Sequence, residues 1–163
     1  MNLPNWITFS RLLGVPALLV LLNSGAETER YWAAGIFLVM ASTDWLDGYL
    51  ARRLNQITEL GKFLDPLVDK LLVLAPLLML VELGQIPAWG VFLILARELT
   101  VAGWRVNQVS VSGANLWGKA KTILQIIAVT VLILDWPGGQ ALFWLAVALT
   151  WVSGAIYLWP RRA

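Results

Sequence analysis

The sequence contains no cysteine and no histidine, and it carries few charged residues. The absence of cysteine excludes a disulfide framework and a thiolate metal site. The absence of histidine removes the commonest general base and the usual ligand of zinc. Any bound metal ion must then be held by oxygen atoms, which favours Mg²⁺, Mn²⁺ or Ca²⁺.

Charged residues make up 13% of the 163 residues, whereas 59% are hydrophobic. Soluble domains usually carry about 25% charged residues, so this composition indicates a membrane protein. The abundance of tryptophan fits that class, because Trp favours the membrane–water interface. The first apolar run lacks a preceding basic segment and is interrupted by Arg11, so we expect it to be retained rather than cleaved as a signal peptide.

Six apolar stretches approach the roughly 20 residues that a membrane-spanning helix requires. The predicted spans cover residues 7–23, 31–51, 62–82, 88–107, 118–135 and 139–159. Turn-rich breaks separate them at 23–25, 55–56, 83–85, 110–115 and 137–139. The sequence therefore predicts an all-α polytopic membrane protein with six transmembrane helices, folded as a single domain over residues 1–163.

The basic residues predict the orientation of this protein. An even number of spans places both termini on one side, and that side with its adjacent span ends collects all but Arg30 of the 12 Lys and Arg residues. Because cytoplasmic loops carry an excess of Lys and Arg, we expect cytoplasmic termini in the cell (inner) membrane. The opposite side carries Glu27, Glu29, Glu82 and Asp135.

Four aspartates stand at the cytoplasmic ends of the second and third predicted spans. Asp44 and Asp47 are three residues apart, and Asp65 and Asp69 are four apart, so each pair lies on one helix face. Carboxylates near a bilayer are costly and repel one another. Two divalent cations would balance their charge, and paired metal ions are a known device for phosphoryl transfer.

Other residues near these aspartates suit a phosphorylated ligand. Gly48 and Gly61 would let a ligand or a neighbouring backbone approach closely, and Arg52 could hold a phosphate in a forked geometry. The alternative is structural: the aspartates could be solvated at the interface or paired with Arg52, Lys62 or Lys70.

The segment from Asp44 to Asp69 resembles the signature of the CDP-alcohol phosphotransferases, D-x2-D-G-x2-A-R-x8-G-x3-D-x3-D, at every fixed position. The resemblance implies transfer of a phosphatidyl or related group from a CDP-linked donor to an alcohol, with release of CMP. It implies that two Mg²⁺ or Mn²⁺ ions are held by the four aspartates, with Asp69 also acting as general base. It places Gly48, Ala51, Arg52 and Gly61 along the nucleotide, and implies six helices and a homodimer.

Three further segments resemble the branch of this family that forms phosphatidylglycerophosphate from CDP-diacylglycerol and glycerol 3-phosphate. They are residues 3–11, 96–100 and 118–125. The resemblance places Asn5 and Thr8 near the nucleotide, although helix capping explains them equally well. Arg11 would hold the donor diphosphate or anchor to lipid headgroups.

Glycerol 3-phosphate is dianionic, so its site requires fixed cations. The candidates near the ends of the fourth and fifth spans are Arg97, Arg105, Lys119 and Lys121. The alternative interpretation makes the basic residues membrane anchors that extend to the interface, with Arg97 paired to Glu98.

Several functional alternatives remain open from the sequence. Inositol phosphate, serine or phosphatidylglycerol could replace glycerol 3-phosphate as the acceptor. From other classes, a divalent-cation transporter would also use intramembrane carboxylates, and a non-catalytic scaffold would not depend on Asp69. The expected partners are the two substrates and the bilayer, with no nucleic acid.

Overall fold

The computed structural model describes residues 3–53, 59–106 and 116–158, with side chains described over 8–43, 66–104 and 116–156. Within those ranges the chain forms six helices and no strand, which confirms the all-α prediction. The helices are α1 (Leu3–Asn23), α2 (Glu27–Arg53), α3 (Glu59–Glu82), α4 (Ala88–Val106), α5 (Leu116–Ile133) and α6 (Gly139–Leu158).

The first two helices begin before the predicted spans, which start at residues 7 and 31. These helices begin at Leu3 and Glu27. For α2 the reason is that hydropathy misses polar residues that are favourable in a first helical turn. Glu27 and Glu29 occupy the first turn of α2, where acidic side chains interact favourably with the helix dipole. The predicted breaks at 55–56 and 110–115 lie outside the described residues.

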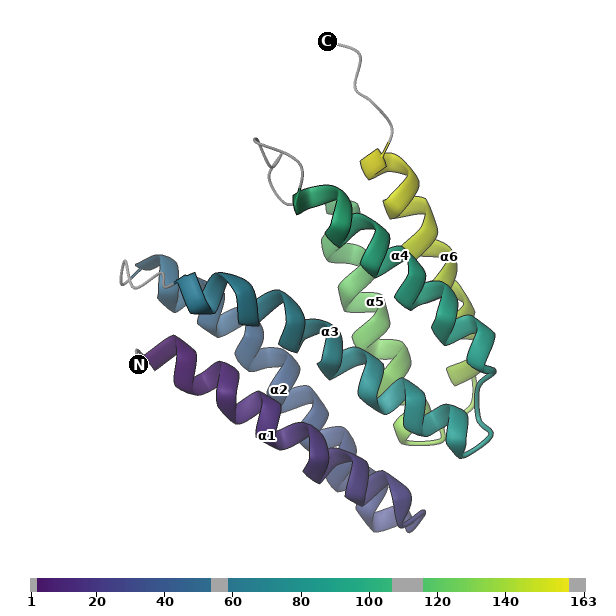
Figure 1. The fold of residues 1–163 in the computed structure, drawn as a ribbon. Coiled ribbons are helices and arrows are strands. Elements are labelled where there is room, and N and C mark those ends of the chain that lie inside the picture. Colours follow the sequence, from purple (N-terminus) through teal and green to yellow (C-terminus); the bar gives the residue numbers. More distant parts are fainter. Residues whose placement is uncertain (1–2, 54–58, 107–115, 159–163) are drawn as a thin grey trace.

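The six helices form two groups (Figure 1). One group contains α1 packed against α2 and α3, and the other contains α6 packed against α4 and α5. Contacts of α5 with α2 and α3, and of α3 with α4, join the groups. The α1–α2, α3–α4 and α5–α6 turns lie at one end of the bundle, here called the turn end, and the start of α1 and the end of α6 lie at the other.

The α3–α4 turn is a closed helix cap. The Gln85 amide donates to the Leu80 carbonyl over 2.9 Å, and the Gly84 amide donates to the Val81 carbonyl over 3.0 Å. This pattern requires a residue at positive φ, which Gly84 supplies at 72°. The cap therefore fixes the direction in which the chain leaves α3.

The end of α5 uses the same pattern with an aspartate in the glycine's place. The Trp136 amide donates to the Val131 carbonyl over 3.1 Å, and Asp135 has a φ of 54°. The Asp135 carboxylate lies 3.0 Å from Arg30 of α2. The predicted span continued to residue 135, but α5 ends at Ile133 because Asp135 adopts this left-handed conformation.

Apolar side chains form both the interior and much of the surface. Phe37, Leu80 and Ile133 are fully buried where the two helix groups meet. Large apolar side chains are also exposed on every helix, including Leu13, Trp32, Leu78, Phe92, Ile123 and Leu145. Within the described residues, α5 and residues 139–156 of α6 are long and apolar enough to cross a membrane. An apolar exterior and these two helices fit a membrane protein.

Candidate functional site

The predicted aspartates lie on two helices that pack against each other. Asp44 and Asp47 belong to the second half of α2, whereas Asp65 and Asp69 belong to the first half of α3. The end of α2 and the start of α3 meet at the end of the bundle opposite the turn end (Figure 1). The side chains of Asp44, Asp47 and Asp65 lie outside the described residues, so their grouping stays a prediction.

Several other predicted site residues also have side chains outside the described set. These are Asn5, Gly48, Ala51, Arg52, Gly61 and Arg105. Thr8, the remaining predicted nucleotide contact, is buried in α1 one turn before Arg11. Their proposed contacts with the nucleotide and the acceptor remain predictions.

Asp69 is held by a cation from another helix. Nη1 of Arg11 in α1 donates to Oδ1 of Asp69 over 3.1 Å. Arg11 is 2% exposed, whereas the Asp69 side chain is 43% exposed. The sequence suggested lipid or diphosphate contacts for Arg11 and did not anticipate this pair. Lys70, which the sequence offered as an ion-pair partner of the aspartates, donates to the Pro66 carbonyl over 3.0 Å.

The chemistry of the aspartate set fits divalent cations. Its donors are carboxylate oxygens from two neighbouring helices, which are the ligands that Mg²⁺ and Mn²⁺ prefer. The exposed fraction of Asp69 makes its carboxylate reachable from outside the bundle. The part of the chain with described side chains contains Asp69 but not its three predicted co-ligands, and it holds no cluster of three or more acidic side chains suited to a metal.

A buried charged cluster joins side chains of α4 and α5, which both pack against α6. Arg97 and Glu98 of α4 and Lys121 of α5 have side chains that are 10%, 16% and 10% exposed. Nη1 of Arg97 lies 3.0 Å from Oε1 of Glu98, and the Lys121 ammonium donates to that same oxygen. The pairing of Arg97 with Glu98, which the sequence left as an alternative, is therefore present, but one carboxylate serves two cations.

Helix α6 contributes to this cluster, which the sequence did not reveal. Nη2 of Arg97 donates to Oγ of Ser153 over 2.9 Å, and that hydroxyl donates to the Thr150 carbonyl over 2.9 Å. Gly154 lies against the Arg97 side chain: a Cβ at this position would lie 3.0 Å from Nε and 3.2 Å from Cγ. The sequence feature that could have indicated this contact is the pair of small residues Ser153 and Gly154, because small residues let helices approach closely.

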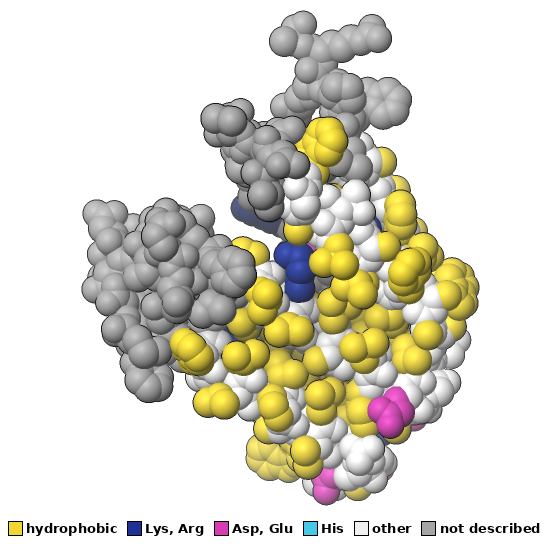
Figure 2. Space-filling view, in the orientation of Figure 1, with side chains coloured by type: hydrophobic (Ala, Val, Ile, Leu, Met, Phe, Trp, Pro, Cys, Tyr) yellow, Lys and Arg dark blue, Asp and Glu magenta, His cyan; other side chains and the backbone are white. Residues whose placement is uncertain are grey.

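The charged cluster lies near the aspartate-bearing helix. Lys70, the residue after Asp69, is close enough to interact electrostatically with both Glu98 and Lys121. Basic side chains lie between the two helix groups, away from the turn end, whereas acidic side chains are prominent at the turn end (Figure 2). Lys119 is exposed, because a separation of two residues turns it to a different face of α5 from Lys121.

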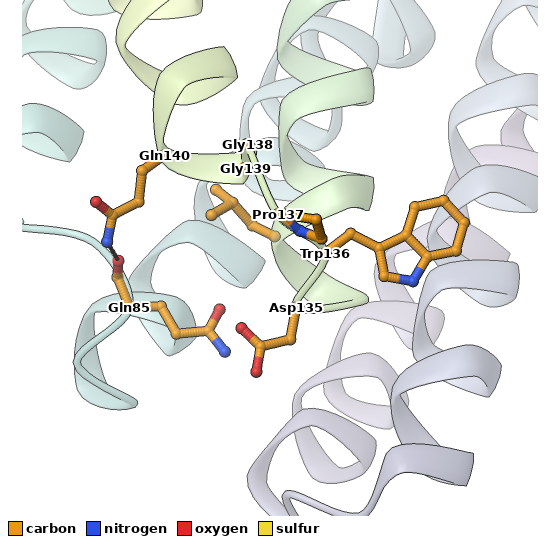
Figure 3. Close-up of a pocket in the computed structure, with 8 residues that line it drawn as sticks. Gln85, Asp135, Trp136, Pro137, Gly138, Gly139 and Gln140 are labelled. Atoms are coloured by element: carbon orange, nitrogen blue, oxygen red, sulfur yellow. Dashed lines mark hydrogen bonds between the residues drawn. The ribbon is translucent and has the colours of Figure 1, made fainter.

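A pocket of about 400 Å³ lies at the turn end. It is lined by Gln85, Leu132, Asp135, Trp136, Pro137, Gly138, Gly139 and Gln140, none of which is a predicted site residue. The Gln140 side chain donates to the Gln85 carbonyl over 3.0 Å, whereas the Trp136 ring points away from both (Figure 3). This contact ties the α5–α6 turn to the α3–α4 turn.

The fold and the site together define an all-helical protein of membrane type. The ionisable side chains of its candidate site come from both helix groups and lie away from the turn end. The family model for CDP-alcohol phosphatidyltransferase matches residues 1–152. The chain belongs to this family, as its signature segment predicted.

Named relatives align over nearly the whole chain. A CDP-diacylglycerol–glycerol-3-phosphate 3-phosphatidyltransferase of Bacillus subtilis is 41% identical, covering 96% of this chain and 93% of the relative. A protein of the same name from Rickettsia bellii is 36% identical with the same coverage. A cardiolipin synthase (CMP-forming) of rice is 35% identical, covering 98% of this chain and 55% of the relative.

Proposed function

We propose that this protein transfers the phosphatidyl group of CDP-diacylglycerol to sn-glycerol 3-phosphate, yielding phosphatidylglycerophosphate and CMP. The bacterial relatives that carry the name of this activity support it along nearly the full chain. The structural observation that carries it is the buried cluster of two cations and one carboxylate. Its remaining positive charge suits an acceptor that carries a phosphate.

The reaction requires a base and a leaving group. The acceptor hydroxyl oxygen attacks the β-phosphorus of CDP-diacylglycerol, the bond from that phosphorus to the CMP oxygen breaks, and Asp69 takes the hydroxyl proton. Arg11 holds the Asp69 carboxylate in one direction from the buried side. The solvent-reachable side of Asp69 is then the side from which the acceptor arrives.

The remaining aspartates would hold divalent cations. Asp44, Asp47 and Asp65, together with Asp69, would bind two Mg²⁺ or Mn²⁺ ions, which when bound neutralise charge on the diphosphate. Asn5, Thr8, Gly48, Ala51, Arg52 and Gly61 would line the CMP moiety. Arg97 and Lys121 would bind the acceptor phosphate, with Arg105 and Lys119 at its outer side.

The membrane arrangement is part of the proposal. Six spans with cytoplasmic termini in the inner membrane are supported by six helices that alternate in direction and by the apolar exterior. The site would then face the cytoplasm, from which the water-soluble glycerol 3-phosphate would enter. A single domain over residues 1–163 and a homodimer complete the proposal, and cross-linking in native membranes tests the dimer.

A second candidate acceptor is phosphatidylglycerol, which would make the product cardiolipin. It is favoured by the similarity to the rice cardiolipin synthase. Its phosphate is a diester with one negative charge, so it matches a pair of buried cations less well than a phosphate monoester does. A transporter function is set aside because the chain belongs to a transferase family.

An acceptor assay tests the proposed function. The purified protein is supplied with CDP-diacylglycerol and, separately, with glycerol 3-phosphate, inositol phosphate, serine or phosphatidylglycerol, and CMP release is measured with Mg²⁺, with Mn²⁺ and with excess EDTA. We expect metal-dependent CMP release with glycerol 3-phosphate. Release with another acceptor alone would overturn the choice of acceptor, and full activity in EDTA would overturn the metal assignment.

A further inference from the structure

The Arg97 guanidinium is positioned by a helix to which the reaction assigns no role. Two of its terminal nitrogens are already engaged, Nη1 with Glu98 and Nη2 with Ser153 of α6. Nε is buried and has no hydrogen-bond partner among the described residues. A guanidinium has five N–H donors, so this side chain retains donors for a ligand after its protein contacts are made.

The charge of the cluster points to an anionic ligand. Arg97 and Lys121 carry two positive charges, and Glu98, whose Oε1 accepts from both, carries one negative charge. All three side chains are largely buried, and a buried net charge is costly unless an opposite charge completes it. A phosphate monoester would supply that charge and would match the planar donor fork of arginine.

The direction of that fork depends on α6. The Ser153 hydroxyl is itself fixed, because it donates to the Thr150 carbonyl one turn earlier in α6. The absence of a side chain at Gly154 lets the Arg97 stem lie directly on the helix backbone. A Cβ at this position would require Nε and Cγ to move by a few tenths of an ångström, and the guanidinium that they carry would shift with them.

We propose that Ser153 and Gly154 of α6 are positioning residues of the acceptor-phosphate site, acting through Arg97 to aim its guanidinium at the phosphate. This inference rests on the proposed function for the identity of the acceptor. The phosphate contact itself does not depend on which phosphorylated alcohol is used. Neither residue touches the reacting atoms, so their effect should fall on acceptor binding.

Steady-state kinetics with both substrates test the proposal. Ser153→Ala removes the hydroxyl that holds Nη2, and we expect the KM for glycerol 3-phosphate to rise about tenfold. The kcat and the KM for CDP-diacylglycerol should stay within about twofold of wild type, because the loss concerns binding of one substrate. Ser153→Thr retains a hydroxyl and should restore most of the acceptor affinity.

Matched glycine substitutions separate positioning from helix packing. Gly154→Ala should raise the same KM severalfold, because its Cβ requires the Arg97 side chain to shift. Gly90→Ala is the control: it lies in the same α4–α6 interface, and its Cβ would lie 2.6 Å from Phe143 Cε1. We expect this control to lower thermal stability and to leave the acceptor KM unchanged.

Inorganic phosphate serves as a probe that does not require turnover. Phosphate should raise the melting temperature of the wild-type protein, and this rise should shrink in Ser153→Ala and Gly154→Ala but not in Gly90→Ala. If the wild-type protein does not use glycerol 3-phosphate but shows these phosphate-dependent shifts in melting temperature, glycerol 3-phosphate is excluded as the acceptor and the positioning role is supported. An unchanged acceptor KM in both α6 variants, or an equal rise in Gly90→Ala, would overturn the positioning role.

Discussion

Arg11 and Asp69 form an ion pair across 58 residues of sequence, with Nη1 and Oδ1 3.1 Å apart. Their burial is unequal, since the arginine is enclosed by the bundle and the carboxylate is about half exposed. The pair therefore joins the interior face of α1 to an exposed side chain of α3. It leads to the first two predictions, one for each partner.

Replacing Arg11 should impair turnover. In Arg11→Met the Asp69 carboxylate loses a charged anchor and can take directions unsuited to the acceptor hydroxyl, so kcat should fall about tenfold to a hundredfold. Arg11→Lys keeps the charge but not the forked geometry, so its kcat should lie between those of wild type and Arg11→Met. The rate of CMP release is measured for both variants. Equal rates for Arg11→Met and wild type would contradict a role of Arg11 in orienting the Asp69 carboxylate.

Asp69→Asn tests the base. The amide oxygen still accepts a hydrogen bond from Arg11, so the fold should be retained, while proton removal is lost and kcat should fall by about 10² to 10⁴. Circular dichroism and the melting temperature in detergent report on the fold, and CMP release reports on turnover. CMP release at a near-wild-type rate would exclude Asp69 as the base.

Glu98→Ala should be the most destabilising of these substitutions. It leaves the buried Arg97 and Lys121 without their shared carboxylate, and removing one partner of a buried ion pair typically costs about 3–5 kcal/mol. The melting temperature should fall clearly, and glycerol 3-phosphate should restore part of the loss by supplying negative charge. A variant as stable as wild type would show that the cluster does not depend on Glu98.

Asp135→Ala should have a smaller effect at the opposite end of the molecule. The ion pair with Arg30 is 67% exposed on the aspartate side, so its loss costs at most about 1 kcal/mol. The alanine must also adopt a φ of 54°, which adds about 1 kcal/mol. Asp135→Asn, which tolerates this conformation, is the control and should be more stable than the alanine variant, with wild-type kinetics in both.

Local sequence pattern predicted the helices well because each apolar run is long and is bounded by turn residues. The predicted span 88–107 and the observed α4, Ala88–Val106, nearly coincide. The start of α2 lies before the predicted span because its polar first turn does not register as apolar. The end of α5 was missed because an aspartate stands where a glycine would have signalled the cap.

For the candidate site, the sequence supplied residue types and their spacing, and the assignment of these residues to a site stays a prediction. The four aspartates and Arg97 were proposed as site residues because ionisable residues are costly in apolar segments and so indicate function. Their partners were not found, because the Arg11–Asp69 and Arg97–Ser153 contacts span 58 and 56 residues. Such contacts depend on how helices pack, and Ser153 and Gly154 carry no charge that would mark them in an apolar helix.

The cap at Gly84 sets the direction of α4 relative to α3, so a small change of angle at this turn moves residues far along α4. Asp69 precedes this turn on α3 and Arg97 follows it on α4, about 14 Å from the start of that helix at 1.5 Å per residue. A rotation of about 4° at the turn would carry Arg97 through about 1 Å, and a misplacement of that size can cost about a hundredfold in rate. The angle set by one glycine at the far end of the bundle thus sets the spacing between Arg97 and Asp69. Under the proposed function, relaxing that angle would slow transfer without altering any group that touches a substrate.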